Sequence, residues 1–107
     1  MVASTVQERE RGLSGTESLP EDSAMLFTFD KPDFYGIWMK DMKIPIDIFW
    51  LDENYKIIHI EENISPQTYP KVFLPPEKST YVLETNAGFA EKNKLKEGKL
   101  LNFSKKL

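Results

Sequence analysis

Between residues 25 and 61 the sequence repeats one pattern, and this pattern restricts the possible folds more than any other feature. Short segments rich in β-branched and aromatic residues alternate with turn residues such as Asp, Asn, Pro and Lys. These segments cover residues 25–29, 35–40, 44–51 and 56–61. Only a few residues separate them, so antiparallel neighbours are expected, because a parallel crossover needs about a dozen residues.

The flanking regions add two short helices and more β-structure. Thr5 and Glu8 have the spacing of a capping box, which predicts a helix over Val6–Arg11. We expect a second helix over residues 87–94, strands over residues 80–85 and 99–103, and a polar surface loop over residues 14–24. The prediction is a mostly β (α+β) fold: a compact antiparallel, β-barrel-like or β-sandwich-like single domain over residues 1–107.

The composition excludes several kinds of chemistry. The chain has no cysteine, which excludes disulfides, thiolate nucleophiles and thiolate metal sites. Its formal net charge of −3 argues against nucleic acid as a partner, and its apolar runs are too short for a membrane-embedded domain. His59 is the only histidine, and Glu61 shares its strand face, but a metal site needs ligands from further elements. We therefore expect neither a metal nor a cofactor.

Two carboxyl groups stand inside apolar strands. Asp47 stands between Ile46 and Ile48 in the segment 44–51, and strand alternation makes both faces of this segment largely apolar. Glu84 lies in a similar position in the segment 80–85. A buried carboxylate needs a partner, and Lys40 and Arg11 are the nearest candidates.

Three interpretations of these charges remain open. Asp47 and Glu84, with Arg11, Lys40 and the aromatic Trp38, could line a pocket that binds a small polar or sugar-like ligand. The two carboxyl groups could instead act as a catalytic pair in a hydrolase-like enzyme. They could also form a purely structural charge network.

The proline-bearing segment 64–77 allows a further interpretation. It contains Tyr69, Val72, Phe73 and Leu74 among four prolines. The segment could be a rigid lid over the core, or it could bind a partner protein if its apolar side chains are exposed.

Several segments in order resemble one protein family. The segments are Glu10–Leu13, Leu19–Asp22, Ala24–Phe29, Trp38–Ile48, Leu51–Asp52, Tyr81–Glu84 and Ala87–Phe89. Together they resemble the domain-of-unknown-function 192 family, also called uncharacterised protein family 0127. Ser14 and the pair Asp41-Met42 depart from the family's usual Met and Asn-Thr.

The resemblance implies a β-rich prokaryotic domain with no established activity. It also implies an extracytoplasmic or membrane-anchored location, although a cytoplasmic one stays open. On this basis we expect that a native N-terminal leader is absent from this chain.

Overall fold

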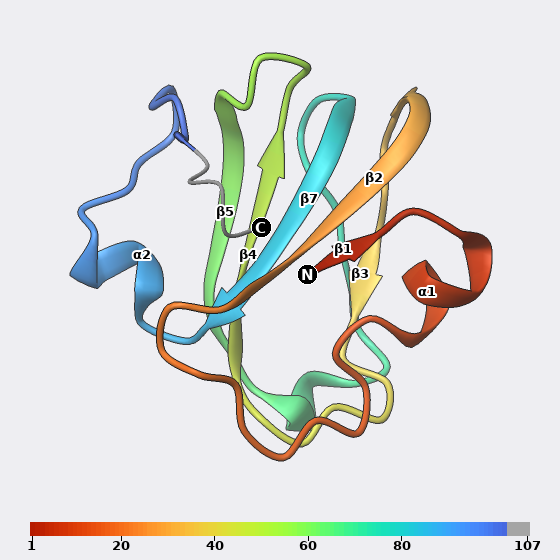
Figure 1. Ribbon diagram of the computed structural model, residues 1–107. Helices are drawn as coiled ribbons and strands as arrows, with labels where there is room; N and C mark the ends of the chain where they lie inside the picture. The colour runs from red at the N-terminus through yellow and green to blue at the C-terminus, as the bar shows by residue number, and fades with distance from the viewer. Residues whose placement is uncertain (103–107) are drawn as a thin grey trace.

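The computed structural model describes residues 1–102 and contains a five-stranded sheet, a two-stranded sheet and two short helices (Figure 1). The larger sheet has the strand order β1-β2-β7-β4-β5, and β3 pairs with β6 in the smaller one. The strand bounds are β1 Val2–Ala3, β2 Ala24–Asp33, β3 Ile37–Trp38, β4 Ile46–Leu51, β5 Ile57–Ile64, β6 Val72–Phe73 and β7 Ser79–Asn86. The helices are α1 Val6–Arg11, α2 Phe89–Lys92 and a single 3₁₀ turn, Pro66–Thr68.

The predicted fold class is confirmed as a mostly β single domain with two short helices. The large sheet is mixed, because β1 runs parallel to β2 while its other strand pairs are antiparallel. Among the described strands it is open, with β1 and β5 at its edges.

Strand β4 lies inside the sheet and is buried on both faces. All six of its residues are buried, as its sequence predicts. Ile46, Ile48 and Trp50 pack into one hydrophobic cluster, while Phe49 and Leu51 pack into another. The sheet therefore separates two cores, because successive side chains of a strand point to opposite faces.

Different parts of the chain cover the two faces, and Figure 1 shows α1 and α2 on opposite sides of the sheet. The first face packs against Leu13, Leu19, Met39 and Phe73, which come from the segments around α1, β3 and β6. The second face packs against α2 and the C-terminal residues of the described chain, through Phe89, Ala90, Leu95 and Leu101.

Helix α1 begins as its sequence predicts. The Thr5 side chain accepts a hydrogen bond from the Glu8 amide at 3.1 Å, and the Glu8 carboxylate accepts one from the Thr5 amide at 3.0 Å. The hydrogen bonds that the Glu8 carboxylate accepts from the Thr5 and Ser4 amides lower the pKa of Glu8. The helix then ends at Gly12, whose φ of +48° suits glycine.

The other predicted elements differ from the structure mainly in length. Of the predicted strand 35–40, only Ile37–Trp38 forms, and the segment 64–77 contains the short strand β6. The predicted helix 87–94 is reduced to Phe89–Lys92. In the predicted closing strand 99–103, Leu100 forms an isolated bridge with Lys56, while residue 103 lies outside the described residues.

Residues 1–102 include no helix that is both long enough and apolar enough to cross a membrane.

Candidate functional site

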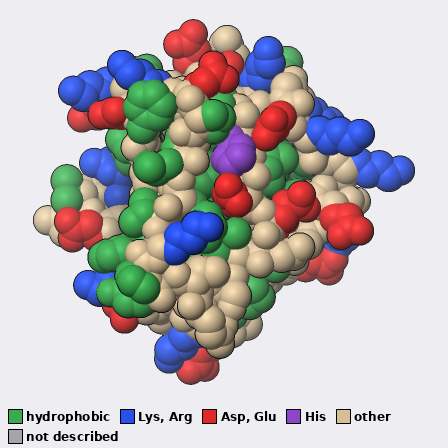
Figure 2. Space-filling view, turned by 180° about the vertical axis from the view of Figure 1, so that it is seen from behind, with side chains coloured by type: hydrophobic (Ala, Val, Ile, Leu, Met, Phe, Trp, Pro, Cys, Tyr) green, Lys and Arg blue, Asp and Glu red, His purple; other side chains and the backbone are tan. Residues whose placement is uncertain are grey.

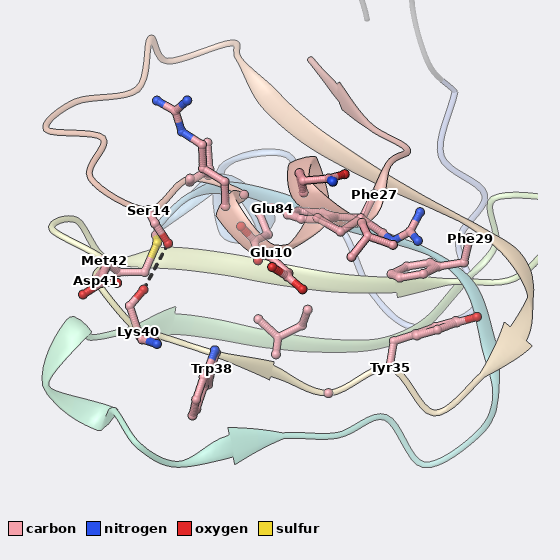
Figure 3. Close-up of a pocket in the computed structure, with 18 residues that line it drawn as sticks. Glu10, Ser14, Phe27, Phe29, Tyr35, Trp38, Lys40, Asp41, Met42 and Glu84 are labelled. Carbon is pink, nitrogen blue, oxygen red and sulfur yellow. Dashed lines mark hydrogen bonds between the residues drawn. The ribbon is translucent and has the colours of Figure 1, made fainter.

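A pocket of about 640 Å³ opens on the first face of the sheet, between α1 and the segment that contains β3 (Figure 3). Its walls come from residues 6–14 on one side and residues 35–42 on the other. Phe27 and Phe29 of β2 and Glu84 of β7 form the part that belongs to the large sheet. Three regions far apart in the sequence therefore build the pocket.

Glu84 is the buried polar side chain of this pocket. It is 5% exposed, and within residues 1–102 its carboxyl group has no hydrogen-bond or ion-pair partner. Its neighbours across the two adjacent strands are Met25 and Ile48, which are apolar. Burial raises the pKa of Glu84 to about 8, because ionisation in these surroundings is not compensated. A carboxyl group that is mostly protonated at neutral pH therefore lines the pocket.

Aromatic and cationic side chains form a stack at one end of the pocket. The rings of Phe29 and Tyr35 are stacked with 3.6 Å between their centroids, and the Arg9 guanidinium lies 5.1 Å from the Phe29 centroid. Arg9 also donates hydrogen bonds to the carbonyl oxygens of Ser4 at 2.6 Å and Thr28 at 2.9 Å. Arg9 thus attaches α1 to β2 and fixes this end of the pocket.

Two hydrogen bonds close the opposite end. The Ser14 hydroxyl donates to the Lys40 carbonyl oxygen at 3.1 Å, and the Gly15 amide donates to the Asp41 carbonyl oxygen at 2.9 Å. They join the residues after α1 to the residues after β3.

Trp38 stands at the margin of the pocket and remains 47% exposed. The Lys40 ammonium lies 5.7 Å from the centroid of its ring. Trp50, by contrast, is completely buried in the core and donates a hydrogen bond to the Tyr35 carbonyl oxygen at 2.8 Å. Of the two tryptophans, Trp38 is therefore the one that a ligand could contact.

Gly12 allows α1 to approach the sheet closely. A Cβ at this position would lie 2.9 Å from Cζ of Phe27, which is itself 3% exposed. A larger residue would push either the helix end or the Phe27 ring out of place.

Charged groups of both signs surround the pocket. The exposed charged side chains that line it are Arg11, Lys40, Glu10 and Asp41. None of these side chains forms an ion pair within the part of the chain that the structure describes. These groups are free to contact a polar ligand.

The structure brings four of the five predicted site residues together: Arg11, Trp38, Lys40 and Glu84 all line the pocket. Asp47 lies elsewhere, and its predicted place beside Glu84 needs correction. In the sheet register, Asp47 is opposite Thr85 while Glu84 is opposite Ile48, so the two carboxyl groups point to opposite faces.

Asp47 is satisfied by the backbone and not by a cation. Its Oδ1 accepts a hydrogen bond from the Asn63 amide at 2.8 Å, and its Oδ2 accepts one from the Ala90 amide at 2.9 Å. Asp47 thereby holds α2 and an irregular part of β5 against β4. The predicted pairing with Lys40 or Arg11 does not form, and this geometry gives no support to a catalytic Asp47–Glu84 pair.

His59 lies on β5, outside the pocket. Its Nε2 and Nδ1 atoms are 2.8 Å and 3.2 Å from carboxylate oxygens of Glu61 and Glu97. Residues 1–102 contain no group of three or more His, Cys, Asp or Glu side chains arranged to hold a metal ion.

Sequence reasoning missed most of the pocket wall. Arg9, Glu10, Phe29 and Tyr35 line it, although none of them was a candidate. The helix end around Gly12 offered one signal, because a glycine stop can indicate a close approach of the backbone to another element.

Comparisons with known proteins place the chain in a family. The model of the family DUF192, described as "Uncharacterized ACR, COG1430", matches residues 1–103. No curated protein matches the chain.

Two solved structures share its fold. One, from Sinorhizobium meliloti 1021, is described as a "putative transcription regulator"; it has 30% identity and a TM-score of 0.87, covering 91% of this chain and 74% of its own. The other, a protein of unknown function from Novosphingobium aromaticivorans DSM 12444, has 26% identity and a TM-score of 0.89, covering 95% of this chain and 72% of its own. With nearly its whole length matched by the family model, the chain belongs to the DUF192 family.

Proposed function

We propose that this protein binds a small polyhydroxylated, sugar-like molecule in the pocket lined by Glu84. The observation that carries this proposal is the buried carboxyl group of Glu84, which lines the pocket without a partner among residues 1–102. An unpaired buried polar group costs free energy, and a ligand that hydrogen-bonds to it recovers part of that cost.

Hydroxyl groups suit this carboxyl group because they both donate and accept hydrogen bonds. They can pair with Glu84 whether it is protonated or ionised. The pocket favours neither sign of charge, because the basic Arg9, Arg11 and Lys40 line it together with acidic side chains, and this suits a ligand whose hydroxyl groups are uncharged.

Trp38 supplies the second feature of a sugar site. Its half-exposed ring at the pocket margin points away from Glu84 in Figure 3 and offers an apolar face on which a sugar ring can stack, beside the Lys40 ammonium. Arg11, Lys40, Glu10 and Asp41 supply further donors and acceptors.

The experiment is a calorimetric titration with glucose, N-acetylglucosamine and galacturonic acid. We compare the natural chain with two variants. Glu84→Met keeps a similar side-chain volume but removes the polar group, and Glu84→Gln keeps the ability to form hydrogen bonds but cannot carry a charge. At least one sugar should bind the natural chain, Glu84→Met should weaken it about tenfold or more, and Glu84→Gln should weaken it less.

Glu62→Met is the matched control, because Glu62 is an exposed residue of β5 that does not line the pocket. It should bind as the natural chain does. If no sugar of the panel binds at millimolar concentration, or if Glu84→Met binds as tightly as the natural chain, the proposal is wrong.

A further inference from the structure

We infer that the ligand is a chain of sugar rings, and that Tyr69, next to Trp38 at the margin of the pocket, forms a second subsite for it outside the pocket. This inference rests on the proposed function and extends it from a single sugar to an oligosaccharide. Three observations on the β3–β6 side of the molecule support it.

The first observation is an exposed aromatic pair that begins at the pocket. Trp38 is 47% exposed and Tyr69 is 44% exposed, and their ring centroids are 5.2 Å apart at an interplanar angle of 58°. Trp38 lines the pocket, whereas Tyr69 does not. A sugar chain that leaves the pocket over Trp38 therefore meets a second aromatic ring at a distance comparable to the length of one sugar unit.

The second observation is that the apolar surface continues along β6. Val72 is paired with Trp38 and is 50% exposed, and Leu74 is 57% exposed. Gly36 makes room for them, since a Cβ there would lie 2.7 Å from Val72 Cγ1 and 3.1 Å from Leu74 Cδ2. Figure 2 shows one face of the molecule with several hydrophobic side chains at its surface, beside basic and acidic side chains and the histidine. Such a surface suits the apolar faces of sugar rings.

The third observation is the charge of this surface. Residues 35–40 and 64–76 contain two lysines and no acidic residue, although the whole chain has a net charge of −3. The Lys40 ammonium lies 5.7 Å from the Trp38 ring and the Lys71 ammonium 4.8 Å from the Phe73 ring. Both can donate hydrogen bonds to sugar hydroxyls or carboxylates.

A second copy of this chain fits the surface less well. Lys40 and Lys71 form no ion pair among residues 1–102. A symmetric contact through these residues would place their ammonium groups against those of the other copy, and like charges in contact are unfavourable. A neutral or acidic sugar chain has no such penalty.

The test measures how affinity depends on chain length. We titrate the intact protein with glucose, N-acetylglucosamine and galacturonic acid, and with their oligomers of two to four units. For at least one series, the affinity of the natural chain should rise about tenfold or more from one unit to three, since each stacked ring adds contact. Tyr69→Ala should abolish this increase and leave the affinity for the single sugar unchanged.

Phe34→Ala is the matched control, because Phe34 is a similarly exposed aromatic residue (48%) that does not line the pocket. It should preserve both affinities. The second subsite would be overturned if the affinity of the natural protein does not rise with the number of sugar units. It would also be overturned if the Tyr69→Ala variant keeps that rise. Either result could occur with normal binding of single sugars, so it is distinct from failure of the proposed function.

Fluorescence provides an independent readout. Trp38 is exposed and Trp50 is completely buried, so acrylamide should quench Trp38 selectively. The oligosaccharide that binds should protect Trp38 from quenching in the natural chain, and an unchanged quenching curve at saturation would contradict stacking on Trp38.

Discussion

At the scale of single residues, two buried carboxyl groups in neighbouring strands have opposite surroundings. Both oxygens of Asp47 accept hydrogen bonds from backbone amides, whereas Glu84 has no partner among residues 1–102 and lines the pocket. The backbone satisfies the first carboxyl group, whereas burial raises the pKa of the second and favours its protonated form. The sequence presents both residues in the same way, as acids inside apolar strands.

Glu84 should make the stability of the protein depend on pH. Because burial raises its pKa from 4.5 to about 8, the folded chain keeps this proton between these pH values while the unfolded chain releases it. The free energy of unfolding should therefore fall as pH rises through this window, by roughly 3–4 kcal/mol between pH 5 and pH 8. Urea denaturation across this range measures the effect.

The variant Glu84→Gln should lose this dependence. Its stability relative to the natural chain should increase from pH 5 to pH 8, whereas the control Glu62→Gln should follow the natural chain. Parallel curves for Glu84→Gln and the natural chain would show that Glu84 ionises normally in the folded protein.

Asp47 should matter for stability instead of binding. Asp47→Asn replaces one of two accepting oxygens by an amide group, so the amide of either Asn63 or Ala90 loses its acceptor. We expect a loss of about 1–3 kcal/mol in the free energy of unfolding, measured by urea denaturation at pH 7. Asp22→Asn, at an exposed position with no hydrogen bond or ion pair in the described chain, should change it little; equal effects of the two variants would contradict the structural role of Asp47.

At the scale of elements, the close contact between the end of α1 and the sheet can be tested with two glycines. Gly12 and Gly15 both have positive φ angles, of +48° and +78°, but only a Cβ at Gly12 would meet Phe27. Gly12→Ala should therefore destabilise the protein by roughly 1–3 kcal/mol more than Gly15→Ala. Thermal denaturation of both variants measures the difference, and equal melting temperatures would show that this contact is not tight.

The sequence predicts elements well where the signal is local. The capping box of Thr5 and Glu8 determines where α1 begins, and the apolar run of β4 shows that both of its faces are buried. The sequence predicts a strand poorly where the length of that strand depends on the partner with which it pairs. The segment 35–40 has strand composition but keeps only two paired residues, because its partner is the short, proline-flanked β6.

Strand register explains the error at Asp47. Alternation shows that Asp47 lies on the same face as Phe49 and that Glu84 lies on the same face as Val82. It does not show which face of β7 matches which face of β4. The register Ile48 opposite Glu84 decides this, and a shift by one residue would have placed both carboxyl groups on one face.

At the scale of the whole molecule, the pocket depends on contacts between distant segments. The end of α1, the β3 segment and β7 meet there, held in part by the hydrogen bonds of Arg9 to Thr28 and of Ser14 to Lys40. Arg11, Trp38, Lys40 and Glu84 could be selected as candidates from their residue types. Arg9 and Tyr35 could not, because their place in the wall follows from the tertiary fold alone.

The central claim is that the Glu84 carboxyl group is held unpaired in the pocket and meets the ligand there. The most direct test is an NMR pH titration of the Glu84 side-chain carboxyl carbon, first in the free protein and then with the sugar that binds most tightly in calorimetry. The claim predicts a midpoint near pH 8 in the free protein and a clear change of both midpoint and chemical shift on saturation with the sugar. A midpoint close to 4.5 that the sugar leaves unchanged would contradict it.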